Sequence, residues 1–537
     1  MTTMQPVLFR SAKFLLGFLT RLNWERIFLV TLTLVSLFSL FYNLELSPRT
    51  WHDEGAAMLL ARTVAEDGVY SVRNSGGYQS FGPVQSVGPT VILPVALSFK
   101  LFGAGILQGR MVAVLFACVT LVVIYKLGKS FFGFFSTMIG LFLLIGSTSA
   151  QFLYFGRQPL GEAPALCLFL AGWYCWFIGK QRNVKGYYAL AGILIGLSMV
   201  TKSSYVVLGG VLLFALCILD IIYYRQKNLF PVLGIAATAS LLVIGWILFQ
   251  RLYFGNEVFT RNAGIMRELG QATTGLSLFN IYLQAKFLLG SKSDYFYFLL
   301  GIPSLFYAAY LSIQKDERGF LTAALTLFAG LWLAYYFYSV PWPAYLFVPS
   351  ALVALFTGKL WHDLISKFCL PPEKLIEGLE QERFTALVQT GILYTVLIMF
   401  ILYPLQNAIQ FHVLGRDNAP QQLAEFMNRE VDQDILVETW ERELGILTDH
   451  LYHFPEQSRL IDVHAAKYRQ SSQGYLLGYE YFNKTQPSFL VVGRFAREFP
   501  LYDPSFLSQN ATVVAQFGDD GLGAYEIFEI NYPLIAP

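Results

Sequence analysis

Long apolar stretches separated by short polar loops dominate the first three quarters of the chain. An α-helix needs about 20 apolar residues to cross the hydrocarbon core of a bilayer. The pattern therefore predicts about eleven transmembrane helices. They begin near Ile27, Met111, Phe134, Glu162, Tyr187, Tyr205, Phe230, Tyr295, Phe320, Tyr345 and Ala386.

One further apolar run, Val87 to Phe102, is short and contains Pro89, Pro94 and Lys100. If it crossed the membrane, every later loop would change sides and the basic loops would face outward. We therefore expect this run to lie in, or dip into, the outer membrane interface.

Basic residues in short loops set the direction of the helices, because they stay in the cytoplasm. Arg10, Lys13, Arg21 and Arg26 precede the first span and place the N-terminus inside. An odd number of spans then places everything after the last span outside. We expect a multi-pass protein of the plasma (inner) membrane, with a first outer loop over residues 45–110 that holds interfacial helices.

The pattern changes at Leu405, where the apolar runs give way to short mixed elements. It predicts one helix and four strands. These are a helix over Asn418–Arg429 and strands over Asp434–Glu438, Phe489–Val492, Thr512–Gln516 and Ala524–Ile530. Such alternation is typical of a small α/β domain. The predicted fold is a polytopic α-helical membrane domain over residues 1–405, followed by an extracytoplasmic α/β domain over residues 406–537.

Composition agrees with this division. Hydrophobic residues make up 55% of the 537 residues and charged residues only 14%, which excludes a disordered chain and an ordinary soluble domain. Residues 1–405 carry 29 Lys and Arg against 18 Asp and Glu, whereas residues 406–537 carry 9 against 18. No basic patch resembles a nucleic-acid footprint, so we expect no nucleic-acid partner. The five cysteines lack metal-site spacing.

The sharpest candidate for chemistry is Trp51-His52-Asp53-Glu54-Gly55, directly after the first span. Adjacent carboxylates at a membrane surface are costly and indicate function. A partly desolvated Asp53 can act as a general base on a hydroxyl, with His52 and Glu54 as substrate contacts. The alternative is that Asp53 only caps the helix predicted over Gly55–Glu66, and that His52 is satisfied locally.

A second candidate is Arg157 to Glu162, which opens a span on the same side as Asp53. Glu162 would share a polar pocket with Asp53, and Arg157 would contact substrate. A helix cap with an Arg157–Glu162 ion pair is the alternative.

Further candidates lie on the same outer side. Lys202 could hold a phosphate, or only reach the lipid headgroups. Trp342 and Tyr345 could stack on a sugar, or form an aromatic belt. The outer loop Arg251–Lys292 is basic, and Arg261 and Arg267 could bind an anion.

The order of these motifs resembles the GT-C superfamily of membrane glycosyltransferases, in its protein O-mannosyltransferase and lipid A aminoarabinose transferase-like branch. The resemblance covers about 360 residues. It rests on Asp53-Glu54, Gly88-Pro89-Thr90, Leu101-Phe102-Gly103, Arg110, Phe132-Gly133, Arg157 with Gly161-Glu162, Lys202, the Tyr345 to Pro349 segment and the outer tail.

The resemblance implies transfer of a sugar from a polyprenyl-phosphate carrier at the outer membrane face, without a nucleotide. It assigns the essential acid to Asp53 and a second acid to Glu162. The family often has a basic residue in its late outer turn, where this chain has Ala344. The loop with Arg261 and Arg267 is therefore the better source of phosphate ligands.

We accordingly expect an inverting glycosyltransferase that is embedded in the membrane lipids and uses Asp53 as general base. Its acceptor would be a hydroxyl group of a lipid, glycan or protein. The branch implies no cofactor; a divalent metal held by outer carboxylates is the alternative. A transporter or flippase of a lipid-linked or anionic substrate is the rival function, but the repeated halves and mid-span charges that it requires are not seen in the sequence. A structural assembly protein would leave the pairing of Asp53 with Glu162 unexplained.

The tail offers one more candidate. Glu438, Trp440, Glu441 and Glu443 follow its first predicted strand, where open α/β sheets bind ligands. Acceptor recognition is the functional interpretation, and a solvated acidic surface is the alternative.

Overall fold

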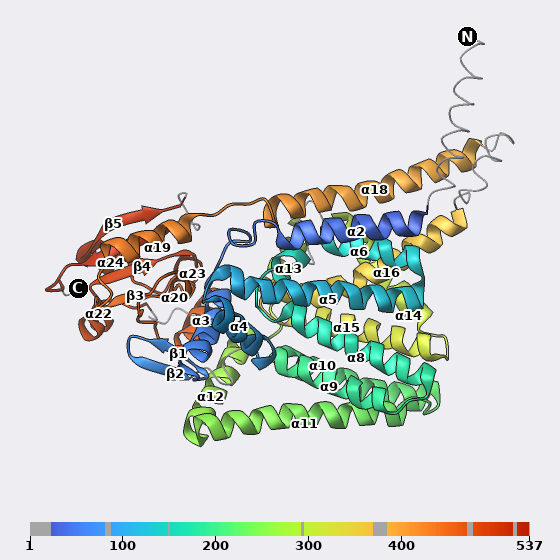
Figure 1. Cartoon of the computed structure of the whole chain (residues 1–537), viewed down its shortest axis with the longest axis horizontal. Coiled ribbons are helices and arrows are strands. Elements are labelled where there is room, and N and C mark those ends of the chain that lie inside the picture. The colour runs from blue at the N-terminus through green and yellow to red at the C-terminus, as the bar shows by residue number, and fades with distance from the viewer. Residues whose placement is uncertain are drawn as a thin grey trace, which may run out of the picture.

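The computed structural model describes residues 23–80, 87–148, 151–290, 295–368, 384–469, 476–518 and 524–535. Most of the chain forms a bundle of long helices, and a small mixed domain sits at one end of this bundle (Figure 1). Arg10, Lys13 and Arg21, on which the predicted orientation partly depends, lie outside the described residues.

Each predicted apolar run is helical in the structure. The helices are α2 (Trp24–Phe41), α5 (Ile106–Phe132), α6 (Phe134–Gly146), α8 (Glu162–Arg182), α9 (Gly186–Thr201), α10 (Ser203–Leu219) with the π-helical turn η1 (Asp220–Tyr224), α11 (Leu229–Phe254), α14 (Tyr295–Leu311), α15 (Glu317–Tyr338), α16 (Ala344–Phe368) and α18 (Phe384–His412). Within the described residues, eight helices are long and apolar enough to cross a membrane. Because α6, α9 and α14 have only 13, 16 and 17 residues, the count of eleven spans stays a prediction.

The bundle buries its helices to different degrees, as expected of helices packed inside a membrane domain. Among the eight long helices, α16 is the most buried and α11 is among the least. The exposed face of α11 carries large apolar side chains such as Phe230, Leu241 and Leu252. Since water does not favour a surface of this kind, it is suited to lipid.

The first loop places its elements at the end of the bundle that carries the mixed domain (Figure 1). They are α3 (His52–Asp67), the hairpin of β1 (Ser71–Asn74) and β2 (Gly77–Ser80), and α4 (Pro89–Phe102). The run from Val87 to Phe102 is thus a 14-residue helix, and α4 packs against α3 and α5. This placement agrees with a helix at the membrane surface.

The basic loop Arg251–Lys292 contains two helices that its polar pattern did not predict, α12 (Asn256–Thr273) and α13 (Leu278–Gly290). Gln284 of α13 donates to the Tyr336 carbonyl at the end of α15. Residues Thr274 and Ser339 form an antiparallel bridge. These contacts fix the loop to the same end of the bundle, and Lys292 lies outside the described residues.

The C-terminal domain is a four-stranded sheet with short helices around it. Its elements are α19 (Ala419–Glu430), β3 (Val437–Thr439), α20 (Leu444–Leu447), α21 (Arg459–Arg469), α22 (Tyr479–Thr485), β4 (Phe489–Val492), α23 (Arg494–Glu498), α24 (Pro504–Asn510), β5 (Ala511–Phe517) and β6 (Tyr525–Ile530). The strand order is β3-β4-β6-β5, with β3 and β4 parallel and the other pairs antiparallel. The predicted α/β class and hairpin are confirmed.

The last helix of the bundle continues past Leu405, where the apolar pattern changes. Helix α18 continues through Pro404 to His412, because Leu405 and Ala408 are buried against the bundle. Asn43, just after α2, donates to the carbonyls of Val413 and Gly415. The ends of α2 and α18 therefore lie side by side, and both helices run toward the C-terminal domain (Figure 1).

Candidate active site

Helix α3 begins earlier than predicted, so Asp53 lies within its first turn. Trp51 is the N-cap in extended conformation, and its side chain makes no capping hydrogen bond. Asp53 is therefore not the cap. Carboxylates in a first helical turn are favoured by the helix dipole, which leaves the Asp53 carboxyl group available for chemistry.

A pocket at this end of the bundle gathers four of the predicted site residues. Asp53, Glu162, Lys202 and Trp342 all line it. The remaining lining residues are Trp51, Ala56, Val87, Phe155 and Leu160. Segments far apart in the sequence thus converge, as predicted for Asp53 and Glu162.

Backbone contacts join the start of α4 to the segment that carries Lys202. Val87 and Lys202 form an antiparallel bridge, and the Gly88 N–H donates to the Thr201 carbonyl at 2.8 Å. A Cβ atom on Gly88 would lie 1.8 Å from the carbonyl oxygen of Val200. Only glycine permits this approach, which explains the Gly-Pro pair that opens α4.

Glu162 and Lys202 form an ion pair in the pocket. Lys202 Nζ lies 2.6 Å from Glu162 Oε1 and donates to the Leu160 carbonyl at 2.9 Å. Within the part of the chain that the structure describes, the other carboxylate oxygen, Glu162 Oε2, is buried with no hydrogen-bond partner. Glu162 thus keeps an acceptor atom for a ligand. It pairs with Lys202 and not with Arg157, contrary to the ion-pair alternative.

Asp53 has the electrostatics of a general base. Burial raises its pKa from 3.8 to about 6, opposed by the positive charge of Lys202 and reinforced by Glu162. Arg442 and Glu498 of the C-terminal domain act on it more weakly and in opposite directions. A base is most effective when its pKa lies near the working pH, so this environment suits Asp53 to proton abstraction.

Aromatic rings form part of the pocket rim. Trp51 and Trp342 stack with centroids 5.7 Å apart and an interplanar angle of 29°. Tyr345 packs edge-on against Tyr335 within the bundle at 4.9 Å, and it is not one of the pocket-lining residues. Of the two predicted stacking residues, only Trp342 therefore reaches the pocket.

His52 does not face the pocket, although the sequence predicts a substrate contact for it. Its ring stacks on Phe495 at a centroid distance of 3.8 Å, and Nδ1 lies 2.7 Å from the Trp440 carbonyl. Because a carbonyl only accepts, Nδ1 carries the proton. His52 thus joins α3 to the C-terminal domain.

Acid should loosen this junction. Burial lowers the pKa of His52 from 6.5 to about 3, so the separated or unfolded chain binds a proton that the docked state excludes. Stability is therefore lost as the pH falls below 6.5, by about 2 kcal/mol at pH 5. We expect the thermal midpoint of the purified protein to fall over this range, and His52→Asn, which retains a donor but does not titrate, to reduce the slope. Equal slopes for both proteins would contradict this role.

Glu54 is also turned away from the pocket. Its two carboxylate oxygens accept from Nε and Nη2 of Arg110 on α5, each at 2.7 Å, and both side chains are fully buried. A ligand cannot reach this carboxylate. In place of the predicted substrate contact, Glu54 fixes α3 to the membrane bundle.

Arg157 has a structural role for the same reason. Its guanidinium is buried and donates to the carbonyls of Ser39, Tyr42 and Ser47, at 2.5 to 2.7 Å. It thereby satisfies carbonyls at the end of α2, which a helix C-terminus leaves without partners. Arg157 does not line the pocket, and its predicted contact with substrate stays a prediction.

Arg261 and Arg267 lie on α12 with exposed side chains, and neither lines the pocket. The same helix packs against α21 of the C-terminal domain. The structure therefore places these arginines near the pocket end of the bundle, and their contact with a phosphate stays a prediction.

The acids in and after β3 are interior groups and do not form a solvated surface. Glu438 accepts from His453 Nδ1 at 2.5 Å and from the hydroxyl groups of Tyr481 and Tyr502. Glu441 accepts from three backbone N–H groups at the start of α23, and Glu443 accepts from the Tyr525 hydroxyl. Trp440 is buried as well. These four residues stabilise the domain itself.

Sequence reasoning missed Arg442, between two of these acids. Its side chain is 2% exposed, and its charge acts on Asp53. Gly55 marks the contact, because a Cβ atom there would lie 2.1 Å from the Glu443 nitrogen. The glycine of the Trp51–Gly55 motif was the available signal that another backbone approaches α3.

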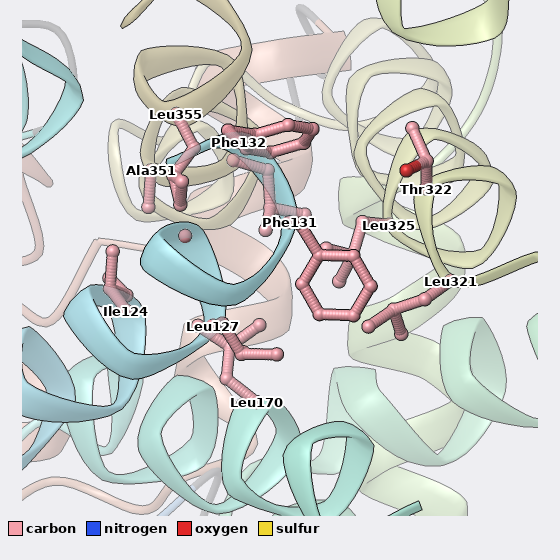
Figure 2. A pocket seen from close by; sticks show the side chains of 12 residues that line it. Ile124, Leu127, Phe131, Phe132, Leu170, Leu321, Thr322, Leu325, Ala351 and Leu355 are labelled. Carbon is pink, nitrogen blue, oxygen red and sulfur yellow. The ribbon is translucent and has the colours of Figure 1, made fainter. Parts of the chain in front are cut away.

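A second pocket contrasts with the first. Helices α5, α8, α15 and α16 line it with apolar side chains, and only Thr322 brings a hydroxyl group (Figure 2). It offers no group for acid–base chemistry. Nor does the described part of the chain contain three or more His, Cys, Asp or Glu residues grouped to hold a metal ion.

Comparisons with known proteins agree with the resemblance found in the sequence. Residues 86–249 match the dolichyl-phosphate-mannose-protein mannosyltransferase family model. No curated protein matches the chain in sequence. ArnT from Cupriavidus metallidurans, solved bound to undecaprenyl phosphate, has a TM-score of 0.58 at 13% identity, over 96% of this chain and 99% of that one.

Archaeoglobus fulgidus AglB, an oligosaccharyltransferase solved with an inhibitory peptide and a dolichol-phosphate, has a TM-score of 0.57 at 13% identity, over 88% of this chain and 70% of that one. A structure of the enzyme from the same organism with Zn and sulfate has a TM-score of 0.56 at 11% identity, over 92% and 72% of the two chains. The chain thus has the fold of these membrane proteins. The predicted resemblance to the GT-C superfamily is confirmed at this level.

Proposed function

We propose that this protein is a glycosyltransferase that moves a sugar from a polyprenyl-phosphate donor to an acceptor hydroxyl group. The observation that carries the proposal is the grouping of Asp53, Glu162 and Lys202 in one pocket at the end of a membrane bundle. A base with a pKa of about 6 beside a cation can deprotonate a hydroxyl and hold a phosphate in the same site. The ArnT and AglB structures contain polyprenyl phosphates, which supports this class of donor.

In the proposed reaction, Asp53 takes the acceptor proton while the acceptor oxygen forms a bond to the anomeric carbon of the sugar. The bond from that carbon to the phosphate oxygen breaks, and the polyprenyl phosphate leaves with the electron pair. Attack opposite the leaving group inverts the anomeric centre.

Lys202 would hold the departing phosphate by a charge-assisted hydrogen bond, which strengthens as negative charge develops there. Glu162 Oε2 would accept from a sugar or acceptor hydroxyl. The stacked rings of Trp51 and Trp342 would contact the apolar face of the sugar. Arg261 and Arg267 remain proposed phosphate contacts from α12.

We place the pocket and the C-terminal domain outside the plasma (inner) membrane, with the N-terminus in the cytoplasm. In this orientation the donor lipid reaches the pocket from the outer leaflet, and the acceptor is a lipid, glycan or protein of the cell envelope. The C-terminal domain covers α3 and is suited to help choose the acceptor.

The experiment is consumption of a purified polyprenyl-monophosphate sugar by the protein in liposomes, with an envelope extract as acceptor. We expect acceptor-dependent release of polyprenyl phosphate. Lys202→Met should weaken donor use by about 100-fold, as for loss of one partner of a buried charge pair. Lys180→Met, which removes a partly exposed cation at the opposite end of α8 from Glu162, is the matched control and should leave the rate unchanged.

The same assay separates the alternatives. A transporter or flippase would move the lipid-linked sugar across the bilayer without breaking its bond to phosphate. We also propose that no metal is needed, because a monophosphate leaving group can be neutralised by Lys202 together with Arg261 or Arg267. A rate abolished by chelator and restored by a divalent ion would contradict this last point.

A further inference from the structure

We propose that the C-terminal domain is a component of the catalytic centre, with Arg442 as a positioning residue that holds the Asp53 carboxylate by charge. This inference rests on the proposed function of Asp53 as the base. It assigns to the domain a part in proton transfer itself, separate from any choice of acceptor.

The first support is the closeness of the two backbones. The space that a Cβ atom on Gly55 would need is filled by the backbone of Arg442 and Glu443, at 2.1 to 2.6 Å. The first turn of α3, which carries Asp53, therefore rests directly on the segment that carries Arg442. These two segments can therefore separate only if the C-terminal domain moves away from α3.

The second support is the rigidity of that contact. His52, the neighbour of Asp53, bonds the Trp440 carbonyl and stacks on Phe495. Arg442 is buried and its guanidinium lies 5.4 Å from the centroid of the Phe454 ring. The charge of a buried cation is little screened by solvent, so Arg442 can act on the Asp53 carboxylate.

The third support is a pair of opposite charges. The charged groups that act on Asp53 are Lys202 and Glu162 from the membrane bundle, and Arg442 and Glu498 from the C-terminal domain. The hydroxyl groups of Tyr154 and Tyr345 also interact electrostatically with Asp53. Each part of the chain thus supplies one cation and one anion, and the domain can be tested through both of its charges.

The test is the pH profile of transfer in liposomes. Removing positive charge favours the protonated form of Asp53, so Arg442→Gln should move the acid limb of the kcat profile to higher pH. Its kcat at pH 6 should fall by about 2- to 5-fold, because less of Asp53 is then ionised, with the KM for donor little changed. Arg442→Lys should restore the acid limb toward that of the wild type. Arg459→Gln, which removes an exposed cation of the same domain, is the matched control.

Glu498→Gln provides the opposite shift and guards against misfolding. Glu498 is partly exposed and pairs with Lys467, so its loss should leave the fold intact. Its acid limb should move to lower pH. Wild-type profiles for both Arg442→Gln and Glu498→Gln would overturn the inference, whereas absence of transfer by the wild-type protein would instead refute the proposed function.

Discussion

Asp53→Asn should lower sugar transfer by about 100- to 10,000-fold, the range that a general base contributes. The amide has nearly the shape of the carboxyl group but cannot take a proton, so the pocket should keep its form and its affinity for donor. Because burial places the pKa of Asp53 at about 6, the wild-type rate should fall as the pH drops through this value. The residual rate of the variant should lack that step.

The matched control is Asp67→Asn at the far end of α3, where the carboxylate pairs with Arg73 away from the pocket. It should transfer sugar at the wild-type rate. Donor binding, measured by retention of labelled lipid, should be intact in both variants. A rate for Asp53→Asn within a few fold of the wild type would exclude Asp53 as the base.

Arg110→Met should produce the largest loss of stability, about 3–5 kcal/mol. The substitution leaves the Glu54 carboxylate buried at 0% exposure without its bidentate partner. Thermal unfolding in detergent should show a clear fall in the midpoint and a lower yield of monodisperse protein. The double variant Glu54→Gln with Arg110→Met should recover part of the loss, because no buried charge then remains.

Arg73→Met is the comparison for this pair. Arg73 bonds Glu66 and Asp67 on the surface of the same helix, and its side chain is 35% exposed. Such a surface pair contributes at most about 1 kcal/mol. Equal midpoints for Arg110→Met and Arg73→Met would mean that the buried pair does not stabilise the fold.

The apolar pattern predicted the helices well because a membrane helix must satisfy its backbone within one continuous segment. It missed α12 and α13, because the loop that contains them was interpreted from its charges alone. In the C-terminal domain, β4 agrees residue for residue, whereas β3 begins three residues later than predicted. Strands of three or four residues depend on their partners, and the partner of β3 lies about 50 residues away.

The candidate site was predictable where its residues lie at the ends of apolar runs, as Asp53, Glu162 and Lys202 do. It was not predictable which of two adjacent acids faces the pocket. Successive helical residues point about 100° apart, so Asp53 and Glu54 serve different neighbours. Arg110 decides which acid faces the pocket, because it binds Glu54, and its position is set only by the tertiary structure. Arg442 was not predictable either, because it approaches α3 from a distant part of the chain.

The contact between His52 and Trp440 joins residues separated by 388 positions. At about 5–20 residues per second, the ribosome needs roughly 20–80 s to make the second partner after the first. During that time Gly55 and the His52 ring of α3 have no C-terminal domain to contact. A chain terminated between the end of α18 and Trp440 would contain every helix of the bundle and still lack the surface that completes α3. The packing of α3 is therefore completed only after the segment around Trp440 has been made.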